Sequence, residues 1–231
     1  IASLESTLRK AGAGSLDFSE WHLAYFARNA FSANLPAFTK GTADYGDDPT
    51  FDQGGNNSMS AALFSRGTGP VSEASCPYVY TKTYLTSALP TGTEATVATL
   101  REALYLGTAF DATTVKTALM NHGALATPIF WEDASYNSST HAYRRLNPTD
   151  STNKNKTNHL VNIVGWDDAY SKANFPTGNQ PTVDGAWIVR NSWGPDWGDA
   201  GYFYMSYDTY VNSAVAFKGA THATGRIYQY D

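Results

Sequence analysis

Apolar positions in the first part of the chain recur at helical spacing. The first such stretch places Ile1, Leu4, Leu8 and Ala11 on one face. Basic side chains close its last turn and a glycine follows, so a helix is predicted over residues 1–11. Further helices are predicted over residues 20–30 behind a capping Asp17–Glu20 stretch, over 60–64, and over 112–121 behind a capping Asp111.

Short apolar runs rich in β-branched or aromatic residues dominate the second half. They predict strands over residues 125–131, 160–164, 186–189, 202–207, 214–217 and 227–230. Residues 84–107 fit a helix or a strand equally well, and both remain open. Stretches rich in Asn, Ser, Thr, Pro and Gly predict loops over 34–51, 136–157 and 167–184, the second of them mobile. A helical first half and a β-rich second half predict an α+β fold.

Composition excludes several classes of function. The 231 residues carry a net charge of −5 with only 16% charged residues and no basic run, so we expect no nucleic-acid partner. No apolar stretch approaches the roughly 20 residues of a membrane helix, so we expect no membrane segment. Five scattered histidines lack metal-site spacing, so we expect no metal and no other cofactor. Few Lys and many Ser, Thr, Asn and Tyr favour an extracellular or cell-envelope protein.

Two polar residues stand at the edges of predicted strands. His159 precedes the run 160–164, and Asn191 follows the run 186–189. If these strands pair, the imidazole and the carboxamide come within hydrogen-bond reach. An amide oxygen that accepts from one ring N–H fixes the tautomer of a histidine and leaves the other nitrogen free for proton transfer. Enzymes that use a nucleophile and a base hold the base in the same way, through a third group that orients it. The alternative is that both residues are merely polar residues at strand ends.

The sequence around these two residues favours the first alternative. The relevant segments are Asn158-His159, Val164-Gly165-Trp166, Trp187, Asn191-Ser192-Trp193-Gly194, Trp197-Gly198 and Gly201-Tyr202. Their order and spacing closely resemble the papain-like cysteine peptidases, with residues 167–184 as an inserted surface loop. The resemblance implies that His159 is the base, that Asn191 orients it, and that Trp193 shields the pair and contributes to substrate binding.

The same resemblance implies an architecture. The expected fold has two lobes with a cleft between them: a helical lobe over residues 1–110 and an antiparallel, β-rich lobe over residues 111–231 that carries His159 and Asn191. Gly54 and Gly55 match the family's Gly-Gly, which presents backbone N–H and C=O groups to an extended substrate.

The nucleophile of such an enzyme is not evident in this sequence. The family places its Cys at the start of a long helix, and the helix over residues 1–11 resembles the continuation of that helix. We therefore expect the Cys to lie upstream of Ile1. Cys76, the single cysteine, precedes a proline and lies closer to His159 than the family spacing of about 130 residues or more, so we interpret it as a structural thiol.

These observations support a functional hypothesis. We expect a papain-like cysteine endopeptidase of a prokaryotic branch that hydrolyses peptide or protein substrates through a Cys-His-Asn constellation, together with accessory domains outside this chain. The 231 residues alone are expected to be inactive. The alternative is a non-catalytic papain-like domain that binds peptides or glycans, although retention of both His159 and Asn191 argues against it.

Overall fold

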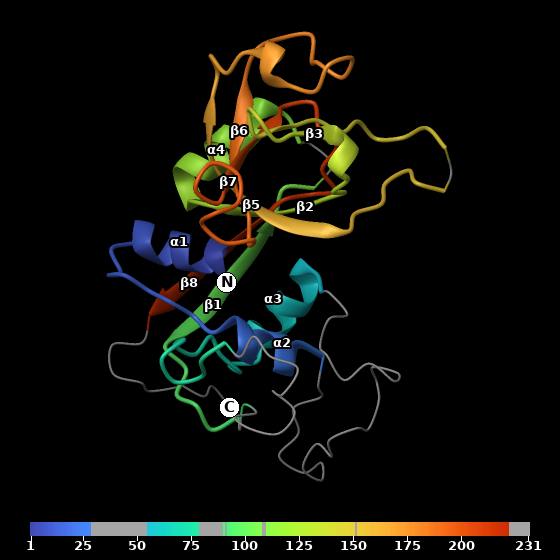
Figure 1. The fold of residues 1–231 in the computed structure, drawn as a ribbon. Helices are drawn as coiled ribbons and strands as arrows, with labels where there is room; N and C mark the ends of the chain where they lie inside the picture. The colour runs from blue at the N-terminus through green and yellow to red at the C-terminus, as the bar shows by residue number, and fades with distance from the viewer. Residues whose placement is uncertain (29–54, 79–89, 91, 108–109, 151, 222–231) are drawn as a thin grey trace. The chain divides into compact units, whose positions relative to one another are not determined.

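The computed structural model describes residues 1–28, 55–78, 90, 92–107, 110–150 and 152–221 (Figure 1). The predicted loop over 34–51, the predicted strand over 227–230, and Gly54 lie outside these residues. Contacts between Cα atoms divide the chain into two compact units. Unit 1 comprises Ile1, Ser3–Glu102 and Lys218–Asp231, and unit 2 comprises Ala2 and Ala103–Phe217. The association of Lys218–Thr221 with the first unit is long-range, and the hydrophobic pattern gives no sign of it. The expected lobe boundary at residue 110 stays a prediction.

Three helices form early in unit 1, all close to their predicted positions. They are α1 (Ala2–Lys10), α2 (Glu20–Arg28) and α3 (Asn57–Ser65). Leu4 and Leu8 of α1 are buried as its pattern predicts, whereas Ala11 is exposed because the helix has ended before it. The Ser19 hydroxyl accepts from the backbone N–H of His22 at 3.0 Å, which caps α2. The Asn56 side chain caps α3 in the same way, so this helix begins three residues before its predicted start.

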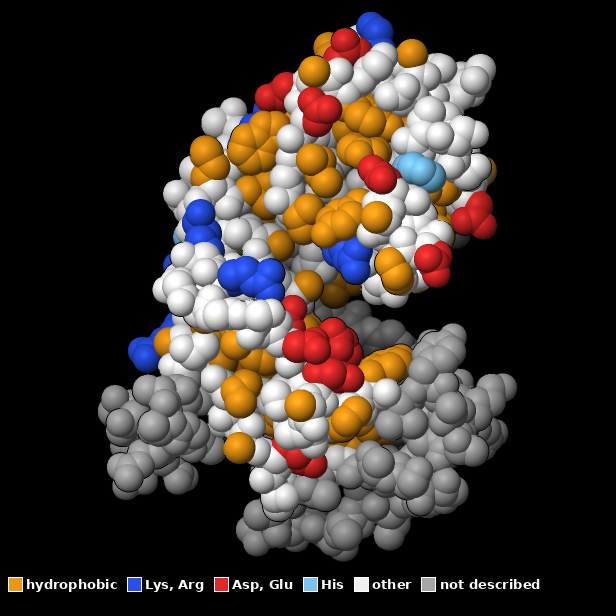
Figure 2. All heavy atoms as spheres, turned by 60° about the vertical axis from the view of Figure 1, so that its left-hand side comes forward, with side chains coloured by type: hydrophobic (Ala, Val, Ile, Leu, Met, Phe, Trp, Pro, Cys, Tyr) orange, Lys and Arg blue, Asp and Glu red, His pale blue; other side chains and the backbone are white. Residues whose placement is uncertain are grey.

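Unit 1 contains several carboxylates at or near its surface and two buried titratable side chains, His22 and Cys76. Burial raises the pKa of Glu20, and repulsion from Glu5 and Glu73 adds to the effect. Burial lowers the pKa of His22, which is 3% exposed, and raises that of the Cys76 thiol. Several acidic side chains also gather in one group on the face drawn in Figure 2. The histidine is therefore favoured in its neutral form and the cysteine in its thiol form.

Among its described residues, unit 2 contains one α-helix and most of the strands. The helix is α4 (Ala112–His122), and Asp111 Oδ1 accepts from the backbone N–H of Thr114 at 2.9 Å to cap it, as predicted. The strands of the chain are β1 (Ala98–Tyr105), β2 (Leu125–Ile129), β3 (Tyr136–Asn137), β4 (Ala142–Tyr143), β5 (His159–Asp167), β6 (Ala186–Arg190), β7 (Tyr202–Ser206) and β8 (Val215–Thr221). The helical alternative for residues 84–107 is thus wrong over 98–105.

The strands form one sheet in the order β1-β8-β2-β5-β6-β7-β4-β3. Each neighbouring pair from β2 to β7 is antiparallel, and β4 runs parallel to its partner β7. β5 lies inside the sheet, because it pairs with β2 on one side and β6 on the other. The predicted pairing of the 160–164 and 186–189 runs is therefore confirmed.

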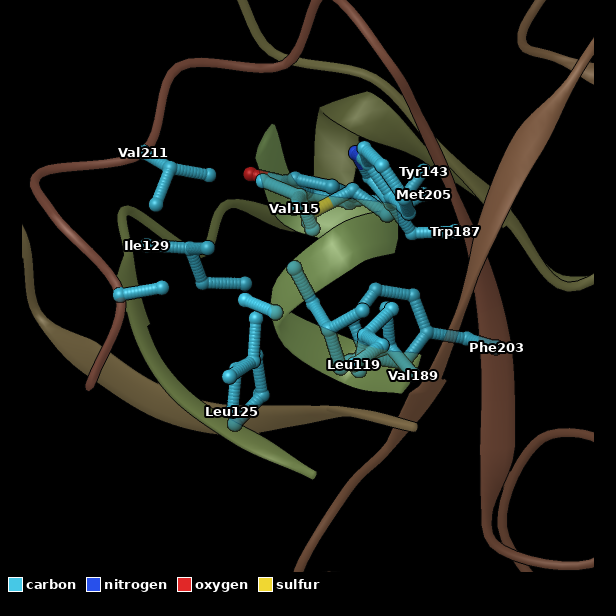
Figure 3. Packing of buried hydrophobic residues seen from close by; sticks show 14 of the residues in the cluster. Val115, Leu119, Leu125, Ile129, Tyr143, Trp187, Val189, Phe203, Met205 and Val211 are labelled. Atoms are coloured by element: carbon cyan, nitrogen blue, oxygen red, sulfur yellow. The ribbon is translucent and has the colours of Figure 1, made fainter. Parts of the chain in front are cut away.

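The core of unit 2 lies between α4 and the sheet. Val115 and Leu119 of α4 meet side chains from the strands around the helix (Figure 3). Ile163, Val189 and Phe203 are fully buried in this cluster and come from three successive strands of the sheet. Burying such side chains contributes about 1.5–3 kcal/mol each, which holds β5, β6 and β7 in register. That register fixes the ends of β5 and β6, where His159 and Asn191 lie.

Two segments predicted as loops are more ordered than their composition indicates. The mobile loop predicted over 136–157 is wrong for its first part, where β3 and β4 pair and Ala142 and Tyr143 are fully buried. Residues 168–185 connect β5 to β6 and contain a short 3₁₀ helix, η2 (Lys172–Asn174). Buried Phe175 and a hydrogen bond from the Arg144 guanidinium to Asn179 Oδ1 at 2.9 Å fasten this connection.

A second short 3₁₀ helix, η1 (Asp133–Ser135), precedes β3. Among the described residues, the helices are too short or too polar for any of them to cross a lipid bilayer.

Candidate active site

The β5–β6 pair brings His159 and Asn191 together. His159 is the first residue of β5 and pairs with Ile129 of β2, while Asn191 directly follows β6. The distance from His159 Nε2 to Asn191 Oδ1 is 2.9 Å. The contact expected from the sequence is therefore present. Its geometry is fixed by the ladder between the two strands, which begins at Asn162 and Arg190 and shifts register by one residue between Ile163 and Gly165.

The hydrogen bonds of Asn191 determine the tautomer of His159. Asn191 Oδ1 also accepts from the backbone N–H of Ser192 at 2.9 Å, and only the oxygen of the amide can do so. The same oxygen must accept from His159, so the ring donates through Nε2–H. The backbone N–H of Asn191 donates to the carbonyl of Gly201 at 3.0 Å, which holds the residue in place. The neutral imidazole therefore presents an unprotonated Nδ1, the nitrogen able to accept a proton.

Burial sets the electrostatics of this pair. Asn191 is 5% exposed, and its Nδ2 has no hydrogen-bond partner among the described residues. Burial lowers the pKa of His159, and the hydrogen bond to Asn191 opposes this by stabilising the charged ring. The imidazole is consequently neutral at physiological pH in the surroundings described here, and any cation formed on it is stabilised by Asn191.

Aromatic rings surround the imidazole. The Trp193 ring lies 5.0 Å from the His159 ring at 30°, and 43% of the residue is exposed. Trp131 meets the imidazole edge-on, with ring centroids 6.1 Å apart. It also meets Trp193 at 5.0 Å and Trp197 at 5.7 Å, both edge-to-face. The three indole rings and the imidazole thus form one aromatic cluster beside Asn191.

The sequence did not single out Trp131 or the role of Asn158. Trp131 lies two residues beyond β2, the strand that pairs with β5, and an aromatic residue at the end of the predicted strand over 125–131 was the available signal. Asn158, directly before the histidine, hydrogen-bonds to the backbone of Trp131 through both ends of its amide. The neighbour of His159 in the sequence thus joins the ends of β2 and β5.

The remaining candidate residues lie in unit 1. Gly55 is exposed, with nothing within 4 Å of the position that a Cβ would take, and Gly54 lies outside the described residues. Cys76 is 5% exposed, and its carbonyl accepts from the Ser19 hydroxyl at 2.5 Å. A buried thiol with a raised pKa is a poor nucleophile. In the described part of the chain, no three His, Cys, Asp or Glu side chains are grouped so that they could hold a metal ion.

Comparison with known proteins identifies the family of the chain. The family model for papain family cysteine proteases matches residues 51–221. Serine-repeat antigen protein 5 of Plasmodium falciparum is 31% identical over 135 residues, which cover 50% of this chain and 12% of that protein. Vignain of Vigna mungo is 48% identical over 50 residues, which cover 21% of this chain and 10% of that protein. The chain therefore spans only a small part of the relatives it matches.

Solved structures extend the comparison to the fold. The cysteine protease and lectin-like domains of Cwp84, a surface layer associated protein of Clostridium difficile, superpose with a TM-score of 0.75 at 27% identity. The match covers 96% of this chain and 46% of the Cwp84 chain. Bromelain from Ananas comosus shares the fold at 17% identity with a TM-score of 0.59, over 94% of this chain and 85% of bromelain. The predicted α+β, papain-like fold is confirmed, and the chain belongs to the papain family of cysteine proteases.

Proposed function

We propose that the protein is a cysteine endopeptidase in which His159 transfers the proton and Asn191 orients it. The observation that carries this proposal is the 2.9 Å hydrogen bond between His159 Nε2 and Asn191 Oδ1, with Nδ1 left free. A base needs one nitrogen held and the other available, and this pair meets both requirements. The family assignment supplies the reaction class, the cleavage of peptide bonds by a thiol.

The chemistry follows from the free Nδ1. Nδ1 first accepts the proton of the thiol, which leaves a thiolate and an imidazolium. The thiolate attacks the peptide carbonyl carbon, and the C–N bond breaks as His159 gives this Nδ1 proton to the leaving amine. Water then attacks the resulting thioester while Nδ1 accepts its proton, and the thiolate is released. During the step in which the ring is charged, Asn191 Oδ1 stabilises the imidazolium through Nε2–H. Trp193 and Trp131 keep water away from that hydrogen bond.

The nucleophile is a thiol other than Cys76 in this proposal. The burial of Cys76 and its raised pKa both oppose thiolate formation, and the following Pro77 prevents a helix from starting there with free N–H groups. We place the nucleophile in a segment upstream of Ile1, as the family resemblance implies. The 231 residues alone would then lack peptidase activity.

The substrate is a peptide or protein chain. Gly54 and Gly55 are proposed to bind its backbone, because a glycine pair allows close approach of an extended strand. Trp193 is proposed to contact the substrate next to the leaving amine, since it is half-exposed and adjoins His159. The surface-layer association of Cwp84 supports an extracellular or cell-envelope location, a prokaryotic source and accessory domains.

Hydrolysis of fluorogenic peptides by the full-length protein tests the proposal. We expect thiol-dependent turnover that an alkylating reagent abolishes, and a loss of about 10³-fold or more in kcat/KM for His159→Ala. Cys76→Ser should retain activity, and His122→Ala, a change at the end of α4 in the same unit, is the matched histidine control. Absence of turnover in the full-length protein with retained peptide or glycan binding would instead support the non-catalytic alternative.

A further inference from the structure

Trp193 is held over the catalytic pair mainly by other aromatic rings. It lies on the segment that follows β6 and is succeeded by Gly194, whose φ is 88°. With 43% of its surface exposed, it is not enclosed by the core. Its ring contacts are to His159, to Trp197 at 4.9 Å and to Trp131 at 5.0 Å. The position of Trp193 therefore depends on how firmly the rings beneath it are held.

Trp131 is held by a hydrogen bond and by a stacked ring. Its Nε1–H donates to Asp133 Oδ1 at 2.9 Å, and its ring stacks on Tyr143 at 4.7 Å with planes 11° apart. Tyr143 is fully buried in the core of unit 2, and its hydroxyl donates to the Phe130 carbonyl. The indole is thus connected to the core on one face and to a carboxylate at its edge.

The backbone of Trp131 is tied to the start of β5. Its N–H donates to Asn158 Oδ1 at 2.6 Å, and Asn158 Nδ2 donates to its carbonyl at 3.0 Å. Asn158 directly precedes His159, so the two hydrogen bonds fix the point at which the histidine enters the strand. One residue accordingly links the end of β2, the start of β5 and the segment after β6.

We propose that Trp131 is a positioning residue that holds Trp193 over the His159–Asn191 hydrogen bond and so restricts the access of water to it. This inference refines the proposed function, since it concerns the same histidine. The Trp131 side chain acts through Trp193 and takes no part in proton transfer, whereas its backbone hydrogen bonds to Asn158 persist in every substitution at this position. Other charged groups near it are already paired: Glu132 binds Arg145 at 3.0 Å, and the Arg145 guanidinium lies 3.9 Å from the centre of the Phe130 ring.

Exchange of the His159 Nε2 proton with water is the direct test. It is measured by NMR on the full-length protein with ¹⁵N-labelled histidine, at one fixed pH, and the signal is identified by its loss in His159→Ala. Loss of one aromatic contact should accelerate the exchange about threefold to tenfold in Trp131→Leu. Trp131→Phe keeps a ring for stacking on Tyr143 and should restore most of the protection. The cross-relaxation between the Trp193 and His159 rings should weaken in Trp131→Leu and return in Trp131→Phe.

Two controls separate positioning from general loosening. Trp166→Leu removes an indole from the far end of β5, against the same core, and should leave the exchange rate unchanged. Asp133→Ala releases Trp131 Nε1 without altering any buried side chain and should accelerate exchange by a smaller factor. Equal rates in Trp131→Leu and the unaltered protein, or an equal acceleration in Trp166→Leu, would overturn the inference. If Trp131→Leu does not fold, an unchanged rate in Asp133→Ala overturns it.

The exchange measurement uses no substrate. Protection that depends on Trp131 in a protein without thiol peptidase activity would leave the positioning role intact and refute the proposed function. Activity without such protection would refute the positioning role alone.

Discussion

Gly198 lies on the segment that carries Trp193 and Trp197 and packs closely against β7. Its replacement by alanine should lower the free energy of unfolding. The residue lies between Trp197 and Asp199 with φ at 61°, a left-handed conformation that costs residues other than glycine about 1 kcal/mol or more. A Cβ at this position would lie 2.3 Å from the carbonyl oxygen of Tyr202. Because that oxygen belongs to the backbone at the start of β7, no side-chain rotation relieves the contact.

The expected loss in unfolding free energy follows from the displacement of this segment from β7. Relieving the contact separates the segment from β7 and disrupts two backbone hydrogen bonds, from Asp199 N–H to Tyr202 at 2.8 Å and from Tyr202 N–H to Asp199 at 2.9 Å. Each contributes about 1 kcal/mol, so Gly198→Ala should cost about 3 kcal/mol in total. Gly178→Ala is the matched control: its φ is 80° and nothing lies within 4 Å of its Cβ position, so it should cost only about 1 kcal/mol.

Urea unfolding of the two variants measures the difference. The free energy of unfolding of Gly198→Ala should be about 2 kcal/mol below that of Gly178→Ala, with a midpoint temperature lower by about 4–8 °C. The displaced segment carries Trp193 and Trp197, so the tryptophan fluorescence of folded Gly198→Ala should also change. Equal unfolding free energies for the two variants would show that the segment after β6 is not held against β7 as described.

Three further outcomes are expected. Asn191→Ala should lower the pKa of His159 further in an NMR titration, because the hydrogen bond that raises it is lost; an unchanged pKa would contradict the pairing. Burial lowers the pKa of His22 in the folded state, so as the pH falls the unfolded state binds a proton at this residue first. The free energy of unfolding should therefore be constant above the unfolded pKa of 6.5 and should decrease as the pH falls below it. The decrease should be less steep in His22→Gln. An equal slope in that variant would assign the pH dependence to other groups. Arg144→Ala should cost about 1–2 kcal/mol and accelerate amide hydrogen exchange over residues 168–185, and unchanged exchange there would show that this connection is held by other contacts.

The sequence predicted the parts of the site that depend on local pattern. The apolar, β-branched run after His159 and the run before Asn191 each form a strand because short buried strands need only such residues. Both polar residues were recognised at the strand edges, and their hydrogen bond follows once the strands pair antiparallel. The caps at Ser19 and Asp111 were likewise visible, since a capping side chain acts on residues two or three positions away.

Features that depend on distant residues could not be predicted in the same way. Trp131 contacts Trp193 only because β2, β5 and β6 are neighbours in the sheet, an order that no local pattern encodes. The segment 136–146 is rich in polar residues, but Tyr143 is buried because β4 pairs in parallel with β7, about 60 residues further along the chain. Such pairings depend on the packing of the whole unit, which local composition does not encode. The polar composition of this segment therefore led to the prediction of a mobile loop.

The proton position on the neutral ring of His159 is the most direct test of the account. ¹⁵N chemical shifts of the imidazole, recorded above its pKa, distinguish a protonated from an unprotonated nitrogen. Because the backbone N–H of Ser192 fixes the Asn191 amide with its oxygen toward the ring, we expect Nε2 to be protonated and Nδ1 to be unprotonated. A neutral ring with its proton on Nδ1 would leave no base facing a nucleophile, and it would contradict the roles assigned to His159 and Asn191.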